Sequence, residues 1–288
     1  MPEADTIFRA ARTLHKALAG ETVKSFETVL PKLARVDYDL GLAERVIEKV
    51  EAQGKWTKMY FSGDLILLTH MLMSGSWHIY RPGEAWKRHR IHHRIVIATE
   101  RYVAVAFNVP VAEFHSPATL TRRLRLLGPS VLAPELDKGK ILANLCAQAD
   151  SEVGAALLNQ LVLAGIGNVF KSEVCFGCGV NPFRRVASLT IQEMACLVAT
   201  ARKFTMTNVT EDSGDQIVTH TGLRRTTGRA SNEERLWVYK RRGKACHRCG
   251  SAIEARKQMP NARSTFWCPQ CQPMVKVGRV VVATGSTG

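Results

Sequence analysis

The sequence predicts an α+β protein with two domains and a small metal-binding segment near its end, on three observations. Short runs rich in Val, Ile, Thr and Tyr, which are typical of strands, occupy about residues 22–107. Longer runs with apolar residues at helical spacing follow from about residue 136. Two Cys-x2-Cys pairs then lie within one basic segment. With 288 residues, of which 45% are hydrophobic, the chain is long enough to form two cores of ordinary size.

The composition argues against two classes of protein. No run of about 18 uncharged apolar residues occurs, so we expect neither a membrane span nor a signal peptide, and we interpret the chain as cytoplasmic. Eight cysteines are too few for a disulfide scaffold. Because thiols in the cytoplasm stay reduced, cysteines that cluster in the sequence indicate metal ligands.

The positive charge is concentrated in the last quarter of the chain. Lys and Arg number 40 against 25 Asp and Glu, a net charge of +15. Residues 221–288 hold 14 basic and 3 acidic residues (+11), which leaves 26 and 22 (+4) for residues 1–220. Aromatic side chains are interleaved with these charges, namely Trp237, Tyr239, Phe266 and Trp267. This mixture favours a folded nucleic-acid-binding module over a bare basic tail.

The first domain begins with a helix and continues with strands. Ile7, Ala11, Leu14 and Leu18 recur at helical spacing after Pro2, and Gly20 ends the run. The clearest strands that we expect are Thr22–Leu30, Trp56–Phe61, Leu65–Thr69, Ser76–Tyr80, Arg94–Thr99 and Tyr102–Phe107. Several strands at this spacing predict a sandwich or a barrel.

The second domain is predicted to be helical. A basic connector interrupted by prolines spans residues 116–134. The helices that we expect after it are Leu136–Ala147, Glu152–Leu163, Val169–Phe176 and Ile191–Phe204. The predicted division is therefore an N-terminal domain at 1–115, the linker at 116–134, a helical domain at 135–230, a cysteine segment at 231–272 and a frayed tail at 273–288.

The cysteine segment carries the most specific motif. Cys246-x2-Cys249 and Cys268-x2-Cys271 are separated by 18 residues, and two such pairs supply the four thiolates of a tetrahedral structural zinc. A segment this small and basic depends on the metal for much of its folding free energy. The metal also makes rigid the stretch just before Cys268, residues Arg263 to Trp267. Arg263, held in this way, can bind a phosphate bidentately.

A second pair, Cys175-x2-Cys178, has two interpretations. With Cys146 and Cys196 it could bind a second zinc. Those partners stand singly in the sequence, so we favour buried apolar cysteines instead.

Several other motifs are ambiguous by themselves. The turn Gly165 to Asn168 can present backbone N–H groups to a phosphate, but an ordinary helix–helix turn explains it as well. Removal of Met1 would leave Pro2 with a secondary amine able to attack a sugar C1′, and Glu3 could transfer protons, yet both residues also suit a helix start. Locally, Lys55 is a solvated turn lysine and Met73 is core filler.

Taken together and in this order, the motifs resemble the bacterial formamidopyrimidine-DNA glycosylase and endonuclease VIII family. The resemblance covers nearly the whole chain and rests on five segments: Pro2-Glu3 with Asp5-Thr6, Gly54-Lys55, Met73-Ser74-Gly75, Ala164 to Asn168 with Ser172-Glu173, and Arg263 to Cys271. It reverses the local interpretation of Pro2, Lys55, Met73 and Asn168.

The resemblance implies an N-terminal β-sandwich flanked by helices and a helix-two-turns-helix domain that carries a zinc finger. DNA would bind in the cleft between them. The implied function is a bifunctional DNA glycosylase and abasic-site lyase of base excision repair, with one structural zinc ion and no organic cofactor. We expect a monomer that binds damaged duplex DNA in the bacterial nucleoid and has no membrane partner.

The resemblance also assigns roles. Pro2 is similar to the family's nucleophile, Glu3 to its acid and base, and Lys55 to a lysine that assists catalysis and contacts phosphate. Asn168 and Arg263 would bind the phosphates beside the lesion, and Met73 would fill part of the gap that the flipped nucleotide leaves. Extrusion is needed because an N-terminal amine cannot reach C1′ of a stacked nucleotide.

The motifs that bear on the preferred lesion are similar to two branches of the family. The opening Pro-Glu-x-Asp-Thr is similar to the endonuclease VIII branch, which removes oxidised pyrimidines, and Phe107–Phe114 lacks the Asp-Pro-Arg-Arg-Phe-Gly segment of the purine branch. Met73 to Ser76 is similar to the purine branch, and Ala4 replaces an expected glycine. We therefore expect oxidised pyrimidines as substrates, with oxidised purines as the alternative. A non-catalytic protein that binds damaged DNA is the alternative from another class.

Overall fold

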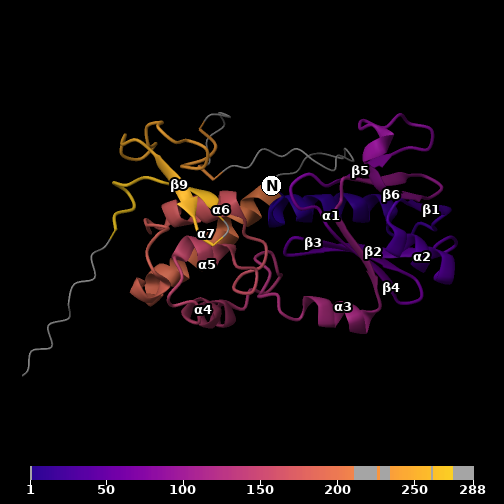
Figure 1. The fold of residues 1–288 in the computed structure, drawn as a ribbon, viewed down its shortest axis with the longest axis horizontal. Coiled ribbons are helices and arrows are strands. Elements are labelled where there is room, and N and C mark those ends of the chain that lie inside the picture. Colours follow the sequence, from indigo (N-terminus) through magenta and orange to yellow (C-terminus); the bar gives the residue numbers. More distant parts are fainter. Residues whose placement is uncertain (1, 211–225, 228–233, 261, 275–288) are drawn as a thin grey trace, which may run out of the picture.

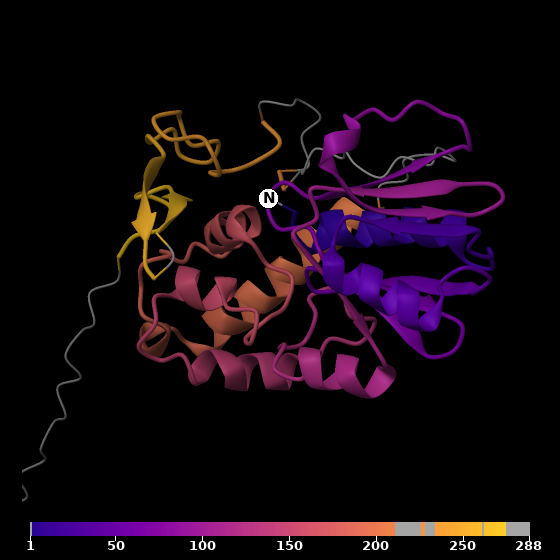
Figure 2. The same ribbon diagram turned by 45° about the vertical axis from the view of Figure 1, so that its right-hand side comes forward.

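The computed structural model describes residues 2–210, 226–227, 234–260 and 262–274. The predicted boundary at 230/231 and the predicted tail from residue 275 onward lie outside this part of the chain. A strand-rich half and a helical half lie side by side, and the start of helix α1 lies where they meet (Figure 1). A two-stranded hairpin lies at the far side of the helical half (Figure 2).

The strand-rich half is a sandwich of two antiparallel four-stranded sheets. One sheet has the order β1 (Ser25–Thr28), β6 (His93–Ala98), β7 (Val103–Phe107) and β5 (Ser76–Tyr80). The other has the order β2 (Ile47–Gln53), β3 (Trp56–Phe61), β4 (Leu65–His70) and β8 (Val111–His115). Apolar side chains from both sheets and from α1 (Ala4–Leu18) form one core, which confirms the predicted sandwich.

The helical half has its own core, built from α4 (Lys138–Cys146), α5 (Val153–Leu158), α6 (Asn168–Gly177) and α7 (Ile191–Thr210). Helices α6 and α7 pack on each other, α5 packs on α6, and α4 packs on α7. The hairpin of β9 (Glu254–Gln258) and β10 (Arg263–Trp267) packs on α6 through β10. Ala4 of α1 belongs to this second core, and α1 also packs on α7, so the first helix joins the two halves.

Two helices lie where the sequence predicted none. Helix α2 (Pro31–Leu40) interrupts the strand-rich region, and α3 (Pro117–Leu124) occupies part of the predicted linker. Both have proline in the first turn, where its fixed φ favours a helix and its missing N–H costs nothing. Ser116 and Thr119 also form a capping box at α3.

The helix predicted for Glu152–Leu163 ends early, at Leu158. The Gln160 side chain donates to the carbonyls of Leu158 and Ile166 and accepts from the N–H of Gly165. These bonds satisfy backbone groups of a turn, so the backbone leaves the helix there. In the described residues, no helix is both long and apolar enough to cross a membrane.

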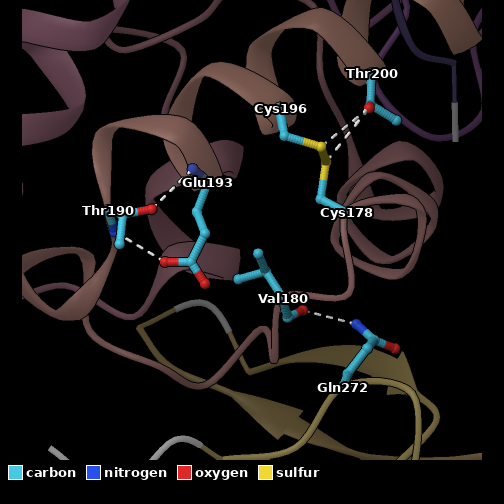
Figure 3. The surroundings of a disulfide bond; sticks show 7 residues. All are labelled: Cys178, Val180, Thr190, Glu193, Cys196, Thr200 and Gln272. Atoms are coloured by element: carbon cyan, nitrogen blue, oxygen red, sulfur yellow. Dashed lines mark hydrogen bonds between the residues drawn. A yellow bond between two sulfur atoms is a disulfide. The ribbon is translucent and has the colours of Figure 1, made fainter.

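Neither interpretation of the second cysteine pair, Cys175 and Cys178, holds for both of its cysteines. Cys178 forms a disulfide with Cys196, because the end of α6 and the start of α7 bring their Cα atoms to 6.0 Å (Figure 3). The expectation that thiols outside the zinc segment are reduced is therefore wrong for this pair. Cys175 is a buried free thiol, as we favoured, whereas Cys146 is exposed.

Candidate active site and metal centre

The candidate site is organised by the carboxylate of Glu3. Glu3 is the N-cap residue of α1 and is fully buried. Its side chain accepts hydrogen bonds from the backbone N–H groups of Gly167 (2.9 Å), Val169 (2.8 Å) and Phe170 (3.3 Å). These groups lie at the positive end of α6, where a carboxylate is favoured. Pro2, one residue earlier, is partly exposed.

The two glycines of the 165–168 turn are explained by the close approach of this N-terminal segment. The N–H of Ala4 donates to the carbonyl of Gly165 at 3.0 Å. Gly165 has a φ of +113°, and a Cβ there would lie 2.6 Å from the Ala4 Cβ. A Cβ at Gly167 would overlap the carboxylate carbon of Glu3. Of the two interpretations of this turn, phosphate binding is excluded for the Gly167 N–H, because Glu3 occupies it.

Lys55 is brought to the same turn by a hairpin. It lies between β2 and β3, and the Gly54 N–H donates to the Ser130 hydroxyl at 3.3 Å. Gly54 packs against Ala164 so closely that an added Cβ would lie 3.0 Å from the Ala164 Cβ. The contact places the tip of the hairpin, with the partly exposed Lys55, beside the segment that holds Glu3.

His70, which the sequence analysis did not single out, lies at the end of β4 near Lys55. The pKa of His70 is lowered to about 4, mainly by burial and to a smaller extent by the charges of Lys55 and Arg123. The imidazole is therefore neutral at neutral pH, and its Nδ1 accepts from the Leu72 N–H at 3.1 Å. The only sequence signal for His70 was its position at the start of the segment that contains Met73.

Two apolar side chains are exposed on the loop between β4 and β5. Leu72 is 44% exposed and Met73 is 61% exposed, so Met73 is not the core filler of the local interpretation. Leu72 has a φ of +46°, and the Gly75 N–H closes the loop on the Met71 carbonyl at 2.8 Å. A tight loop thus presents two adjacent apolar side chains to solvent.

Asn168 and the zinc hairpin are joined directly. The Asn168 Nδ2 donates to the carbonyl of Ser264 at 2.8 Å, next to the exposed Arg263, while its Oδ1 is buried with no hydrogen-bond partner among the described residues. One turn along α6, the fully buried Lys171 donates from Nζ to the Thr265 hydroxyl at 2.6 Å. Burial lowers the pKa of Lys171 to about 8. These bonds hold the start of β10 against the start of α6.

Glu173, which lies on α6, is a second fully buried carboxylate. It accepts from the backbone N–H groups of Trp237 (2.8 Å), Val238 (2.9 Å) and Tyr239 (2.8 Å) and from the Thr226 hydroxyl. The sequence analysis cited Glu173 only as part of the resemblance. The structure shows that it anchors the segment leading into the zinc hairpin.

The four predicted zinc ligands form one cluster. The Sγ atoms of Cys246, Cys249, Cys268 and Cys271 all lie within 4.8 Å of one another. Two of the Sγ pairs are separated by 3.9 Å (Cys246–Cys271) and 3.4 Å (Cys249–Cys268). A tetrahedral zinc with Zn–S bonds of about 2.3 Å needs sulfur atoms about 3.8 Å apart, so the cluster fits a structural zinc.

Comparison with known families gives the chain three consecutive matches. Residues 1–110 match the formamidopyrimidine-DNA glycosylase N-terminal domain, residues 127–219 match the formamidopyrimidine-DNA glycosylase H2TH domain, and residues 243–273 match the zinc finger found in FPG and IleRS. The chain belongs to the formamidopyrimidine-DNA glycosylase and endonuclease VIII family. Membership places the protein among the DNA-repair enzymes of the glycosylase and abasic-site lyase class.

Individual members of this family are similar over nearly their whole length. The chain is 37% identical over 275 residues to the probable endonuclease 8 2 of Streptomyces coelicolor, with 94% of each chain covered. It is 34% identical to the DNA-(apurinic or apyrimidinic site) lyase Nei2 of Mycolicibacterium smegmatis, with 94% and 99% covered. A complex of Lactococcus lactis Fpg with DNA containing an abasic site has the same fold, with a TM-score of 0.80, 20% identity, and 94% and 100% coverage.

Proposed function

We propose that the protein removes oxidised pyrimidines from duplex DNA and cleaves the strand through an iminium at Pro2. The observation that carries this proposal is the placement of Glu3. Its buried carboxylate fixes the first residues against α6 and leaves Pro2 partly exposed, and α1 begins where the two halves meet (Figure 1). Lys55, Asn168 and Arg263 approach the same end of α6, as described above.

In the proposed reaction, the neutral Pro2 nitrogen attacks C1′ and the bond from C1′ to the damaged base breaks, so that the base leaves with a proton. The sugar ring opens to give the iminium. Loss of a C2′ proton then breaks the C3′–O bond, and a second elimination breaks the C5′–O bond before water releases the enzyme. Glu3 transfers protons in these steps. A nearby cation such as Lys55 favours the neutral amine.

The remaining candidate residues bind DNA in this proposal. Asn168 and Arg263 contact phosphates beside the lesion, and the zinc, held by the four cysteines, keeps the hairpin rigid. Met73 fills the space that the flipped nucleotide leaves, and the exposed neighbour Leu72 extends the same apolar surface. A soluble monomer in the bacterial cytoplasm, acting at the nucleoid, completes the proposal.

Two observations favour pyrimidine lesions. Two relatives with endonuclease 8 names are 37% and 34% identical to this chain, ahead of a relative named formamidopyrimidine-DNA glycosylase at 30%, although the endonuclease 8 of Escherichia coli is 28% identical. The connection between β7 and β8 also consists only of residues 108–110. A connection this short cannot insert further side chains into the DNA double helix. Duplexes with an oxidised pyrimidine, an oxidised purine or a plain abasic site would measure the preference. Faster release of the purine would reject this part of the proposal.

The position of the nucleophile can be tested chemically. Borohydride should trap the protein on lesion DNA, with the adduct at Pro2 by peptide mass mapping. Two residues added before Pro2 turn its amine into an amide, and we expect cleavage to fall below detection while DNA binding remains. The same residues added at the C-terminus are the control. An adduct at a lysine, or normal cleavage by the N-terminally extended form, would reject Pro2. If the protein retains Met1 and leaves lesion DNA uncut, the alternative of a non-catalytic protein that binds damaged DNA is favoured.

A further inference from the structure

The disulfide between Cys178 and Cys196 lies at the opposite end of α6 from Glu3. Cys178 is the C-cap residue of α6, and Cys196 lies in the second turn of α7. Both cysteines are partly exposed, so small oxidants and reductants can reach them. The bond closes a loop with a sequence separation of 18 residues. None of the candidate catalytic or DNA-binding residues lies in this loop.

The neighbouring groups determine which thiols can react. Cys175 is completely buried one turn before Cys178, and burial raises the pKa of its thiol to about 12. The thiolate is the reactive form, so the apparent Cys175-x2-Cys178 motif is not the redox pair. The Thr200 hydroxyl lies 3.3 Å from the Sγ of Cys178 and 3.8 Å from that of Cys196. Dashed lines mark both contacts in Figure 3. In the reduced protein this hydroxyl can donate to either thiolate.

We propose that Cys178 and Cys196 form a reversible redox staple, oxidised by peroxide, that stabilises the helical half under oxidising conditions. One thiolate attacks hydrogen peroxide, which forms a sulfenic acid and releases hydroxide. The second thiol displaces water from the sulfenic acid and forms the disulfide, so that two thiols and one peroxide give one disulfide and two waters. A dithiol reductant returns both thiols and becomes a disulfide itself. Disulfides in reducing compartments are commonly of this transient kind.

The staple completes the attachment of α6. Glu3 holds the start of the helix with three hydrogen bonds, and the disulfide holds its end to α7. Closing the loop restricts the unfolded chain and leaves the native contacts at Glu3 and Asn168 in place. Oxidation therefore raises heat stability without changing the candidate site. This inference does not depend on the lesion or on Pro2.

The test uses the zinc-loaded full chain. It is treated with one equivalent of hydrogen peroxide, free thiols are alkylated, and the linked peptides are identified by mass. We expect a Cys178–Cys196 linkage that dithiothreitol reverses, and a melting temperature that is roughly 5–10 °C higher in the oxidised form. Cys178→Ser and Cys196→Ser should each abolish the difference in melting temperature between the oxidised and reduced forms. Cys146→Ser, which alters an exposed unpaired thiol, is the matched control and should keep it.

Thr200→Val provides a second measurement, because it removes the hydroxyl but retains the packing volume. We expect slower formation of the linkage, by several-fold, with an unchanged melting temperature for the reduced protein. The proposal is overturned by a linkage that includes Cys175, by oxidation of the four zinc-site cysteines while Cys178 stays reduced, or by equal melting temperatures of the oxidised and reduced forms.

Discussion

Glu3 and Glu173 are both fully buried carboxylates that accept three backbone N–H bonds, but they act on different kinds of segment. Glu3 comes from outside α6 and binds the N–H groups at the start of that helix. Glu173 comes from α6 and binds an irregular segment, Trp237 to Tyr239, that leads to the zinc hairpin. The same interaction thus fixes the N-terminus on one side of α6 and the metal-binding segment on the other.

The difference lies in what adjoins each carboxylate. Glu3 follows Pro2, so its position also decides where the Pro2 nitrogen lies, which is the nucleophile in the proposed reaction. Glu173 is next to aromatic side chains, and Phe176 of the same helix stacks on Trp237 with ring centroids 5.3 Å apart. We conclude that one buried carboxylate organises the candidate chemistry and the other organises the metal-binding segment. The predictions below test this division, from the largest expected effect to the smallest.

Removal of the metal tests whether Glu173 can hold its segment without zinc. Chelation, or Cys268→Ser, should unfold the hairpin, because a segment of this size takes most of its folding free energy from the metal. We expect duplex affinity to fall by at least about 100-fold while the sandwich retains its strand signal, measured by fluorescence anisotropy and circular dichroism. Restored binding after zinc is returned is the control. Undiminished binding by the metal-free protein would contradict the assignment of the cysteines.

Glu3→Gln and Glu173→Gln form a matched pair, since each replaces a buried acceptor with an amide that faces N–H donors. Both should cost about 1–3 kcal/mol of unfolding free energy. Only Glu3→Gln should slow base removal, by about 10²–10⁴-fold, in single turnovers at saturating protein, because it also removes a proton-transfer group. Glu173→Gln should remain within about tenfold of the wild type. Equal losses of rate in the two variants would show that Glu3 acts only through folding.

Lys171 lies on α6 between the helix start that Glu3 binds and Glu173, and it provides a pH test. Its pKa falls from the ordinary 10.5 to about 8 on folding, mainly through burial, so the unfolded chain binds a proton that the folded chain has lost between these values. The resulting stability is present above the unfolded pKa and is lost as the pH falls to about 8. The melting temperature of the wild type should therefore rise between pH 8 and 10 relative to Lys171→Met, by a few degrees. Parallel pH profiles would reject a buried, titrating Lys171.

Arg263→Ala should have the smallest effect. Arg263 is exposed at the start of β10, so its loss leaves the hairpin folded. We expect weaker binding to all DNA sequences and a salt dependence that is flatter by about one phosphate contact. Titrations at several salt concentrations measure this slope, and Lys257→Ala on the neighbouring strand is a surface control. A slope equal to that of the wild type would remove Arg263 from the interface.

The sequence predicted those elements whose signals are local. Trp56–Phe61 and Ser76–Tyr80 are short runs rich in aromatic and β-branched residues and are strands with the predicted bounds, and the spacing of the four cysteines was sufficient to predict their cluster. The family resemblance, not any local pattern, identified Pro2 and Glu3. It could not reveal that Glu3 occupies the N–H groups of Gly167 and Val169, because that contact spans more than 160 residues.

Other features were missed because tertiary contacts decide them. Helix α2 lies among strands and has a single fully buried residue, Leu33, so its apolar pattern is weak. Glu173 reads as an ordinary helical acid until the segment around Val238 folds onto it. The pairing of Cys178 with Cys196 depends on how α6 and α7 pack, and sequence spacing pointed to Cys175 instead.

The presence of Ala4 in the core of the helical half limits how this chain can be divided. A fragment that begins at the second domain would expose the cavity left by Ala4 and would leave three N–H groups of α6 without the carboxylate that satisfies them. The halves are therefore not interchangeable parts that a gene fusion could exchange. A swap between relatives would need to carry the first few codons together with the 165–168 turn, although most of the gene separates them.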